Sequence, residues 1–153
     1  MDNKINILYV DDEINNLVSF KALFRLKYHV FTAEGGKEAM EILNKENIQV
    51  IITDQRMPEM TGVELLESIV ETHPDPIRIL LTGYADLNAV IDAVNKGKIY
   101  HYLSKPWNEK ELEDTIERAF EIYQLRENDE ETKNKLRISN EQFEFLLRQK
   151  LIS

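Results

Sequence analysis

Five short apolar segments alternate along the chain with segments whose apolar residues recur at helical spacing. The apolar segments are Ile5–Val10, His29–Ala33, Val50–Asp54, Ile77–Leu81 and Ile99–Leu103. Several are unbroken runs of Ile, Val and Leu, which is typical of parallel strands covered on both faces. The second segment is more polar, which predicts a strand at the edge of the sheet. Strands that alternate with helices through short loops predict an α/β fold, a doubly wound five-stranded parallel sheet with helices on both faces.

Four helices are predicted between these strands. Their apolar faces consist of Leu17, Phe20, Leu23 and Phe24 in the first, Ala39, Ile42 and Leu43 in the second, Val63, Leu66, Ile69 and Val70 in the third, and Leu87, Val90, Ile91 and Val94 in the fourth. We expect Thr61 to cap the third helix and Gly97 to follow the fourth, because these residue types favour helix starts and ends.

The chain changes character after Pro106, where no sixth strand is predicted. A fifth helix is expected from Asn108, with an inner face formed by Leu112, Ile116, Ala119, Phe120 and Tyr123. The stretch Glu127–Lys135 has no large apolar side chain, which favours a solvated helix or linker. Apolar residues then recur at helical spacing, at Leu136, Phe143, Leu146, Leu147 and Leu151. We therefore predict a domain over residues 1–124 and a helical extension over residues 125–153, which we expect to lead to an output domain outside this sequence.

Composition limits the classes of function. With 153 residues, 42% of them hydrophobic, the chain suits one domain with a packed core and an extension. A net charge of −9 argues against direct binding to nucleic acid, which requires clustered Lys and Arg. The absence of cysteine excludes disulfides, a thiolate nucleophile and Cys-ligated zinc. The N-terminus has no signal-peptide pattern and no apolar run reaches the roughly 18 residues of a membrane span, so we expect a cytoplasmic protein.

Polar residues with related chemistry stand at the ends of four predicted strands. Asp11 and Asp12 follow the first strand, and Asp54 ends the third. Thr82 follows the fourth strand, and Lys105 lies just beyond the fifth. Because the carboxyl ends of parallel strands share one edge of the sheet, three carboxylates, a hydroxyl and an ammonium group are expected to converge there.

The chemistry of this group favours a bound cation. Three close carboxylates repel one another, at a cost on the order of 1 to 4 kcal/mol for each pair, and a hard divalent cation such as Mg²⁺ offsets that repulsion. A carboxylate beside Mg²⁺ can act as a nucleophile toward a phosphoryl group, with the Lys and the hydroxyl holding the phosphoryl oxygens. An alternative stays open for Asp11 or Asp12 taken alone, since strand-end Asp residues often cap the following helix.

At these residues the chain resembles the response-regulator receiver domain of two-component signalling, over about residues 4–122. The resemblance is carried by four segments in order at compatible spacing: YVDDE, TDQRMPEMTG, LTGYAD and YLSKPW. It implies the strand order 2-1-3-4-5, which is that of the chemotaxis receiver. The segments DQRMP and YHYLSKPW are most similar to receivers attached to ATPase-type transcription activators or to cyclic-dinucleotide phosphodiesterases.

The resemblance also implies how a metal and a phosphoryl group are held. Asp54 would be the phosphoacceptor. Asp12 and Asp54 would bind Mg²⁺ directly, together with the backbone carbonyl of Arg56, whereas Asp11 would act through bound water. The side chain of Arg56 stays open between a solvated loop residue and one that overhangs the site.

Three further residues have roles implied by the resemblance. Thr82 would bind a phosphoryl oxygen, Lys105 would pair with the phosphate, and Tyr102 occupies the aromatic switch position. A cis bond before Pro106 would direct the Lys105 side chain toward the acidic residues, since cis is energetically accessible only before proline.

The function that this resemblance implies is a phosphorylation-dependent signalling switch that catalyses its own phosphorylation and slow dephosphorylation. The phosphoryl group would come from a histidine kinase or a phosphotransfer protein. Phosphorylation would change a surface made by the fourth helix, fifth strand and fifth helix. Separately from the resemblance, the apolar residues of the C-terminal helix indicate a contact site, so a homodimer is expected through that helix or through the face of the fourth helix, fifth strand and fifth helix. Two alternatives remain: a phosphorylation-independent scaffold, and an aspartyl-phosphate hydrolase, which normally has an acidic residue where this chain has Arg56.

Overall fold

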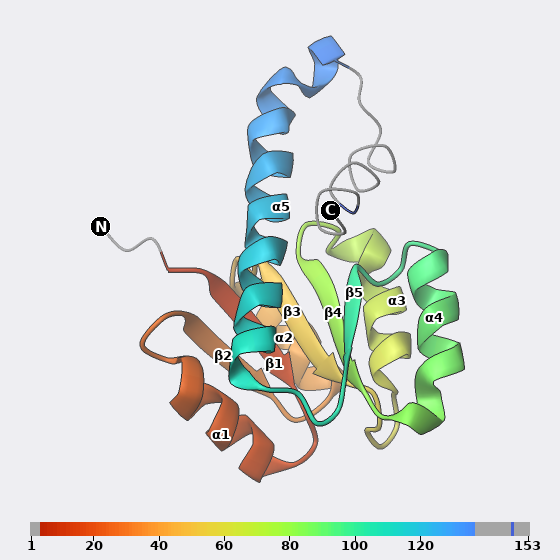
Figure 1. The fold of residues 1–153 in the computed structure, drawn as a ribbon. Helices are drawn as coiled ribbons and strands as arrows, with labels where there is room; N and C mark the ends of the chain where they lie inside the picture. The colour runs from red at the N-terminus through yellow and green to blue at the C-terminus, as the bar shows by residue number, and fades with distance from the viewer. Residues whose placement is uncertain (1–3, 137–147, 149–153) are drawn as a thin grey trace.

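Five parallel strands form the single sheet of this computed structural model, which describes residues 4–136 and residue 148. The strand order is β2-β1-β3-β4-β5, which places the more polar β2 at an edge (Figure 1). The strands are β1 (Asn6–Val10), β2 (His29–Ala33), β3 (Val50–Asp54), β4 (Ile77–Thr82) and β5 (His101–Ser104). Both the predicted fold class and the strand order implied by the resemblance are therefore confirmed.

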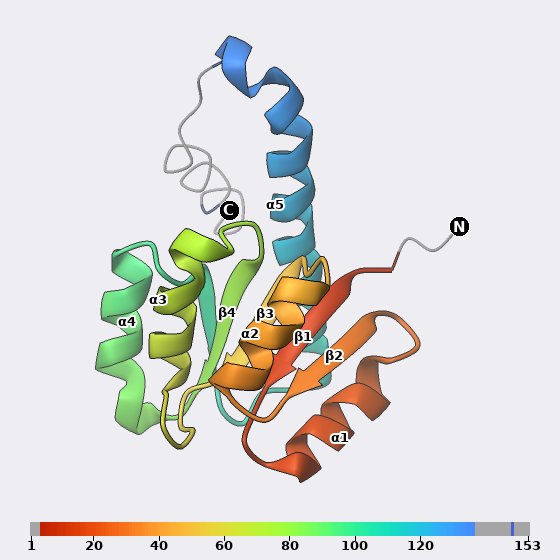
Figure 2. The same ribbon diagram turned by 180° about the vertical axis from the view of Figure 1, so that it is seen from behind.

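Helices cover both faces of the sheet. Helices α1 and α5 lie on one face, and α2, α3 and α4 lie on the other, as the two opposite views show (Figures 1 and 2). The helices are α1 (Ile14–Phe24), α2 (Gly36–Lys45), α3 (Gly62–Thr72), the short 3-10 helix η1 (Tyr84–Asp86), α4 (Leu87–Asn95) and α5 (Glu109–Leu136).

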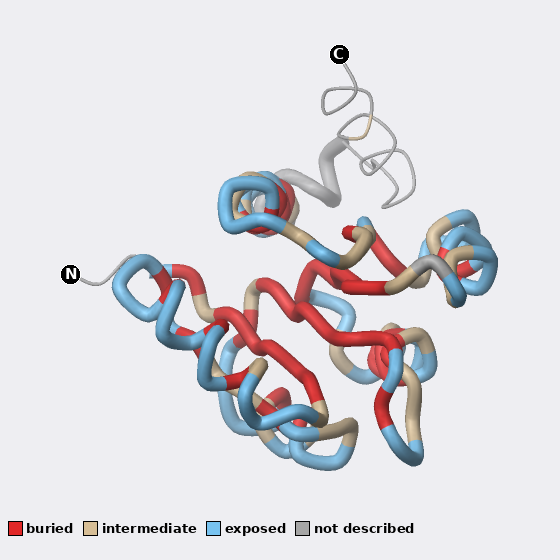
Figure 3. The backbone as a smooth tube through the Cα atoms, turned by 60° about the horizontal axis from the view of Figure 1, so that its bottom comes forward, coloured by how far each residue is buried: buried red, intermediate tan, exposed pale blue. Residues whose placement is uncertain are grey.

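The sheet separates two hydrophobic cores, because successive side chains of a strand point to opposite faces. In β1, Ile7 and Tyr9 belong to the core under α1 and α5, whereas Leu8 and Val10 belong to the core under α2, α3 and α4. The buried backbone is concentrated in the strands and in the inner sides of the helices (Figure 3). Burial on both faces explains why the strands appear in the sequence as continuous apolar runs.

The predicted helix ends are confirmed. The Thr61 side chain accepts a hydrogen bond from the backbone N–H of Glu64, whose carboxylate accepts one from the backbone N–H of Thr61, so the two residues form a capping box. The Asn108 side chain accepts a hydrogen bond from the backbone N–H of Glu111, at the start of α5. Gly97 follows α4 with φ of +76°, a left-handed conformation that glycine adopts without steric cost.

Two residues assigned to buried helix faces were predicted wrongly. Leu23 in α1 is 40% exposed and Ile91 in α4 is 38% exposed. Each lies at the margin of its helix's buried stripe, where a side chain is only partly covered by the sheet. Phe20 and Phe24, closer to the centre of the α1 stripe, are fully enclosed.

Helix α5 continues without interruption past residue 124 and extends beyond the sheet (Figure 1). Four residues of the predicted apolar extension lie outside the described residues: Phe143, Leu146, Leu147 and Leu151. Within the described part of the chain, no helix has the length and apolar character needed to cross a membrane.

Candidate functional site

Three carboxylates meet at the carboxyl edge of the sheet. Asp11, Asp12 and Asp54 each place a carboxylate oxygen so that all three oxygens lie within 4.8 Å of one another. The pairing of β1 with β3 is responsible, because it sets Val10 beside Thr53 and therefore brings the two strand ends together. The convergence of the acidic residues expected from the sequence is found in the structure.

Close packing behind Asp54 requires a glycine at the start of α3. A Cβ added to Gly62 would lie 2.4 Å from the backbone oxygen of Asp54 and 2.7 Å from a methyl carbon of Leu80. The buried Gln55 completes this junction. Its backbone carbonyl accepts a hydrogen bond from Gly62 N at 2.9 Å, and its side-chain carbonyl accepts one from Val63 N at 2.9 Å. These contacts fix the segment after β3 and thereby the position of Asp54, the expected phosphoryl acceptor.

Asp11 is fully buried and accepts three hydrogen bonds. The Tyr9 hydroxyl donates to Oδ2 at 2.8 Å and the Asn16 amide donates to the same oxygen at 3.0 Å. The backbone N–H of Glu13 donates to Oδ1 at 3.0 Å. The N-cap residue of α1 is Glu13, whose side chain makes no capping hydrogen bond. Asp11 and Asp12 precede this position, so neither is the N-cap residue, although Asp11 accepts a hydrogen bond from the backbone N–H of Glu13.

Lys105 closes the site from the end of β5. Its amine forms an ion pair with the Asp54 carboxylate, and its backbone N–H donates to the Thr82 carbonyl at 2.8 Å. The peptide bond between Lys105 and Pro106 is cis, as the resemblance implied. Segments that are about fifty residues apart in sequence thus meet at one carboxylate.

Burial and like charge shape the electrostatics of the site. The pKa of Asp54 is raised above its ordinary value, chiefly because burial disfavours the charged form and further because Asp11 and Asp12 repel it. Lys105 opposes this rise by hydrogen bonding and by its positive charge. Burial and the neighbouring Asp11 also raise the pKa of the Tyr9 hydroxyl, which stays protonated as a donor.

Thr82 and Tyr102 lie where the sequence predicts. Thr82 ends β4 beside Ser104 of β5 and is 1% exposed, and its hydroxyl donates to the Gly83 carbonyl at 3.1 Å. Tyr102 is half-buried and packs against the core beneath α2, α3 and α4. The two residues lie on neighbouring strands, Thr82 on β4 and Tyr102 on β5, which follow β3 in the sheet.

An ion pair that sequence reasoning missed joins two loops at this edge. The Arg56 Nε lies 2.9 Å from Asp86 Oδ2, which links the loop after β3 to the start of α4. The Asp86 carboxylate raises the pKa of Arg56. The Arg56 side chain is thus exposed but paired with Asp86, the last residue of η1. No local sequence pattern signals a pair of residues 30 positions apart.

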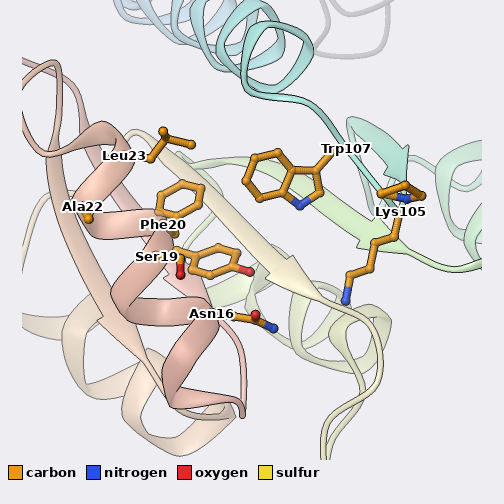
Figure 4. Close-up of a pocket in the computed structure, with 9 residues that line it drawn as sticks. Asn16, Ser19, Phe20, Ala22, Leu23, Lys105 and Trp107 are labelled. Carbon is orange, nitrogen blue, oxygen red and sulfur yellow. The ribbon is translucent and has the colours of Figure 1, made fainter.

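A cavity of about 940 Å³ lies beside the acidic cluster, between α1 and the loop from β5 to α5. Trp107 faces Phe20 and Leu23 across it, while Asn16 and the Lys105 amine lie toward one end (Figure 4). The cavity therefore opens next to the residues that hold Asp11 and Asp54.

The donor set fits a hard divalent cation. Carboxylate oxygens are the ligands that Mg²⁺ prefers, and it is usually held by one or two carboxylates together with water molecules. Among the residues that the structure describes, the cluster of Asp11, Asp12 and Asp54 is the one group of three such side chains close enough to share an ion.

The sequence pattern of a known family coincides with this geometry. The pattern described as "Response regulator receiver domain" matches residues 7–117, which include all of the converging residues. The chain belongs to the response regulator receiver domain family. Receiver domains of this family serve phosphorylation-based two-component signalling, so the resemblance seen in the sequence is confirmed.

Relatives of this chain include transcriptional regulatory proteins. The hydrogenase transcriptional regulatory protein HoxA of Cupriavidus necator is 36% identical over 125 residues, which are 82% of this chain and 26% of HoxA. The DNA-binding transcriptional regulator NtrC of Escherichia coli is 35% identical over 114 residues, which are 74% of this chain and 24% of NtrC. The chain thus spans about a quarter of the length of these curated relatives.

The fold agrees with solved receivers. A response regulator receiver domain protein from Clostridium thermocellum superposes with a TM-score of 0.75 at 33% identity, covering 79% of this chain and 98% of that one. An adenylate cyclase structure from Rhodopirellula baltica gives a TM-score of 0.83 at 32% identity, covering 86% of this chain and 98% of that one.

Proposed function

We propose that this receiver is a switch in which Asp54 accepts a phosphoryl group from a histidine kinase or a phosphotransfer protein. The observation that carries the proposal is the meeting of Asp54 with Asp11, Asp12 and the Lys105 amine at one edge of the sheet. Such an arrangement combines a nucleophile, a cation site and a fixed positive charge. The experiment that tests the proposal is phosphorylation of the Asp54→Asn variant, described in the Discussion.

The proposed transfer is a nucleophilic substitution at phosphorus. An oxygen of the ionised Asp54 carboxylate forms a new bond to phosphorus while the bond from phosphorus to the donor imidazole breaks, and the imidazole leaves with that electron pair. Lys105 lies against Asp54, where its positive charge meets the phosphoryl oxygens as their charge is redistributed. Asp54 thereby becomes an aspartyl phosphate.

The cation would be Mg²⁺, held directly by Asp12, Asp54 and the backbone carbonyl of Arg56, with Asp11 acting through bound water. When bound, Mg²⁺ supplies positive charge that offsets the three carboxylates and the oxygens of the phosphoryl group. The protein contributes the fixed spacing of the carboxylates. The folded sheet holds them close together in spite of their mutual repulsion, so they need not be brought together when the cation binds.

Phosphorylation is proposed to shift an existing equilibrium between two conformations. The Thr82 hydroxyl would exchange its bond to the Gly83 carbonyl for one to a phosphoryl oxygen, and the half-buried Tyr102 would turn inward. The surface made by α4, β5 and α5 would then change its affinity for a partner or for a second copy. A change of a few kcal/mol in the free-energy difference between the two conformations is sufficient for such a switch.

The geometry supports neither alternative function. A hydrolase of the haloacid-dehalogenase type needs a general acid two residues after its nucleophile. That position is Arg56, whose side chain is 74% exposed and paired with Asp86. A scaffold without phosphorylation has no need of the ion pair between Lys105 and Asp54 or of the clustered carboxylates.

Lys105→Ala is expected to leave Mg²⁺ affinity no weaker, and to tighten it by about fivefold, because removing one nearby positive charge relieves about 1 kcal/mol of repulsion in a solvated site. The variant should also lose the change that phosphorylation produces over α4 and β5. Calorimetric Mg²⁺ titration and hydrogen exchange with and without acetyl phosphate measure the two effects. Lys110→Ala, on an exposed turn of α5, is the control. Weaker Mg²⁺ binding by Lys105→Ala would contradict its assignment.

Self-association is proposed through the C-terminal apolar residues or through the α4, β5 and α5 face. Each buried apolar side chain of this size contributes roughly 1.5 to 3 kcal/mol before association costs, enough in combination for a modest dimer. Sedimentation of a Phe143→Ser, Leu147→Ser double variant tests the first interface. Ile91→Ser, at an exposed position of α4, tests the second. A dimer that neither variant dissociates would rule out both interfaces, as would a monomeric parent chain with and without acetyl phosphate.

A further inference from the structure

The Asp11 carboxylate is held from three directions. An ionised carboxylate has about four positions at which it accepts hydrogen bonds. Tyr9 and Asn16 occupy two of these on Oδ2, and the backbone of Glu13 occupies one on Oδ1. A single acceptor position therefore remains, which suits a water-mediated contact with a cation better than direct bidentate binding.

Tyr9 is itself fixed by the fold. Its ring stacks on Phe20 with centroids 4.1 Å apart and planes 10° apart, and the residue is 2% exposed. Its backbone lies in β1, which is paired with β2 on one side and β3 on the other. The hydroxyl is therefore presented to Asp11 from a rigid element, whereas the carboxylate torsion of an Asp is intrinsically broad.

Asn16 approaches the same oxygen from a different element. It lies in the first turns of α1, and with Tyr9 it lines the cavity beside the acidic cluster (Figure 4). Two side chains that donate to one oxygen from a strand and a helix leave the carboxylate little freedom to rotate. Outer residues that orient a ligand in this way typically influence metal affinity strongly.

We propose that Tyr9 and Asn16 are positioning residues, which hold the Asp11 carboxylate toward the cation that it shares with Asp12 and Asp54. This inference rests on the proposed function, because it assumes that the cluster binds Mg²⁺. The rival explanation is purely structural: Asp11 would serve only to satisfy a buried tyrosine hydroxyl. The two explanations differ in whether removal of the Tyr9 hydroxyl lowers the affinity of the site for Mg²⁺.

Tyr28 provides a matched control. It stands at the other end of the same row of aromatic rings, which runs from Tyr9 through Phe20 and Phe24. It is 3% exposed, and its hydroxyl donates to Glu117 at 2.6 Å. Tyr28→Phe therefore removes a comparable hydroxyl-to-carboxylate hydrogen bond at a site remote from the acidic cluster.

The test compares Tyr9→Phe, Tyr28→Phe and the parent chain by calorimetric Mg²⁺ titration. We expect Mg²⁺ affinity to fall several-fold in Tyr9→Phe, by less than complete removal of the Asp11 carboxylate would cause, because Asn16 and the backbone of Glu13 still hold that carboxylate. In Tyr28→Phe the affinity should be unchanged. In phosphorylation by acetyl phosphate, the half-saturating Mg²⁺ concentration of Tyr9→Phe should rise by the same factor. Its rate at saturating Mg²⁺ should stay within about twofold of the parent, because the nucleophile and Lys105 are untouched.

Parental Mg²⁺ affinity in Tyr9→Phe would overturn the inference, as would a lower plateau rate without a shift in half-saturation. Asn16→Ala supplies a second test at a half-buried position of α1, and it decides the question if Tyr9→Phe does not fold. A several-fold loss of Mg²⁺ affinity in Asn16→Ala supports the inference, and parental affinity overturns it. Absence of Mg²⁺ binding by the parent chain would show instead that the proposed function is wrong, and the inference would fall with it.

Discussion

Asp54→Asn is expected to abolish Mg²⁺-dependent phosphorylation by acetyl phosphate while leaving the fold intact. An amide of nearly the same shape leaves the backbone of residue 54 against Gly62 undisturbed but has no charged oxygen to attack phosphorus. Intact-mass measurement after incubation with acetyl phosphate and Mg²⁺ should show one added phosphoryl group on the parent chain and none on the variant. Normal phosphorylation of the variant would contradict the assignment of Asp54 as the acceptor.

The same variant has a pH-dependent signature. Because the fold raises the pKa of Asp54, ionisation of this group destabilises the folded state, and the penalty appears as pH rises through the raised pKa. Without Mg²⁺, the variant should therefore melt at a higher temperature than the parent at pH 7, by about 2 to 4 °C for each 1 kcal/mol relieved. At a pH below the ordinary carboxyl pKa this gain should disappear. Asp75→Asn, at an exposed loop position, serves as the control for the loss of one charge.

Asp12→Ala is expected to weaken Mg²⁺ binding far more than Asp11→Ala. Removal of a proposed direct ligand should lower the affinity by about 100-fold. Removal of a carboxylate that acts through water should lower it by about tenfold. Each variant loses one of three mutually repelling charges. The difference between their Mg²⁺ affinities therefore shows which carboxylate binds the cation directly, and it does not reflect a difference in charge.

Calorimetric titration with Mg²⁺ measures both affinities, and Asp92→Ala, in an exposed pair with Lys96, controls for a general loss of negative charge. Equal effects of Asp11→Ala and Asp12→Ala would show that the assignment of direct and water-mediated ligands is wrong. A stronger effect of Asp11→Ala would reverse that assignment. In that case the three hydrogen bonds to Asp11 would be orienting a direct ligand.

The sequence by itself determined the architecture and the main residues of the site. Continuous runs such as Val50–Asp54 and Ile77–Leu81 reveal strands buried on both faces, because only such strands lack polar alternation. Once a parallel sheet is inferred, the shared carboxyl edge follows, and with it the meeting of Asp54 with Asp11 and Asp12. The strand order required more than periodicity, and it came from resemblance to a family.

Only the tertiary structure decided which side chains support the site. The Tyr9 hydroxyl bonds Asp11 only two residues away, but the ring that carries it is held by stacking on Phe20 of α1, a contact between two elements. In the sequence, Tyr9 is indistinguishable from any core aromatic in an apolar run. The ion pair of Arg56 with Asp86 joins two loops whose separation depends on the packing of α3 and α4. Sequence patterns report the local period of each element, whereas these contacts arise from the distances between elements, which packing alone determines.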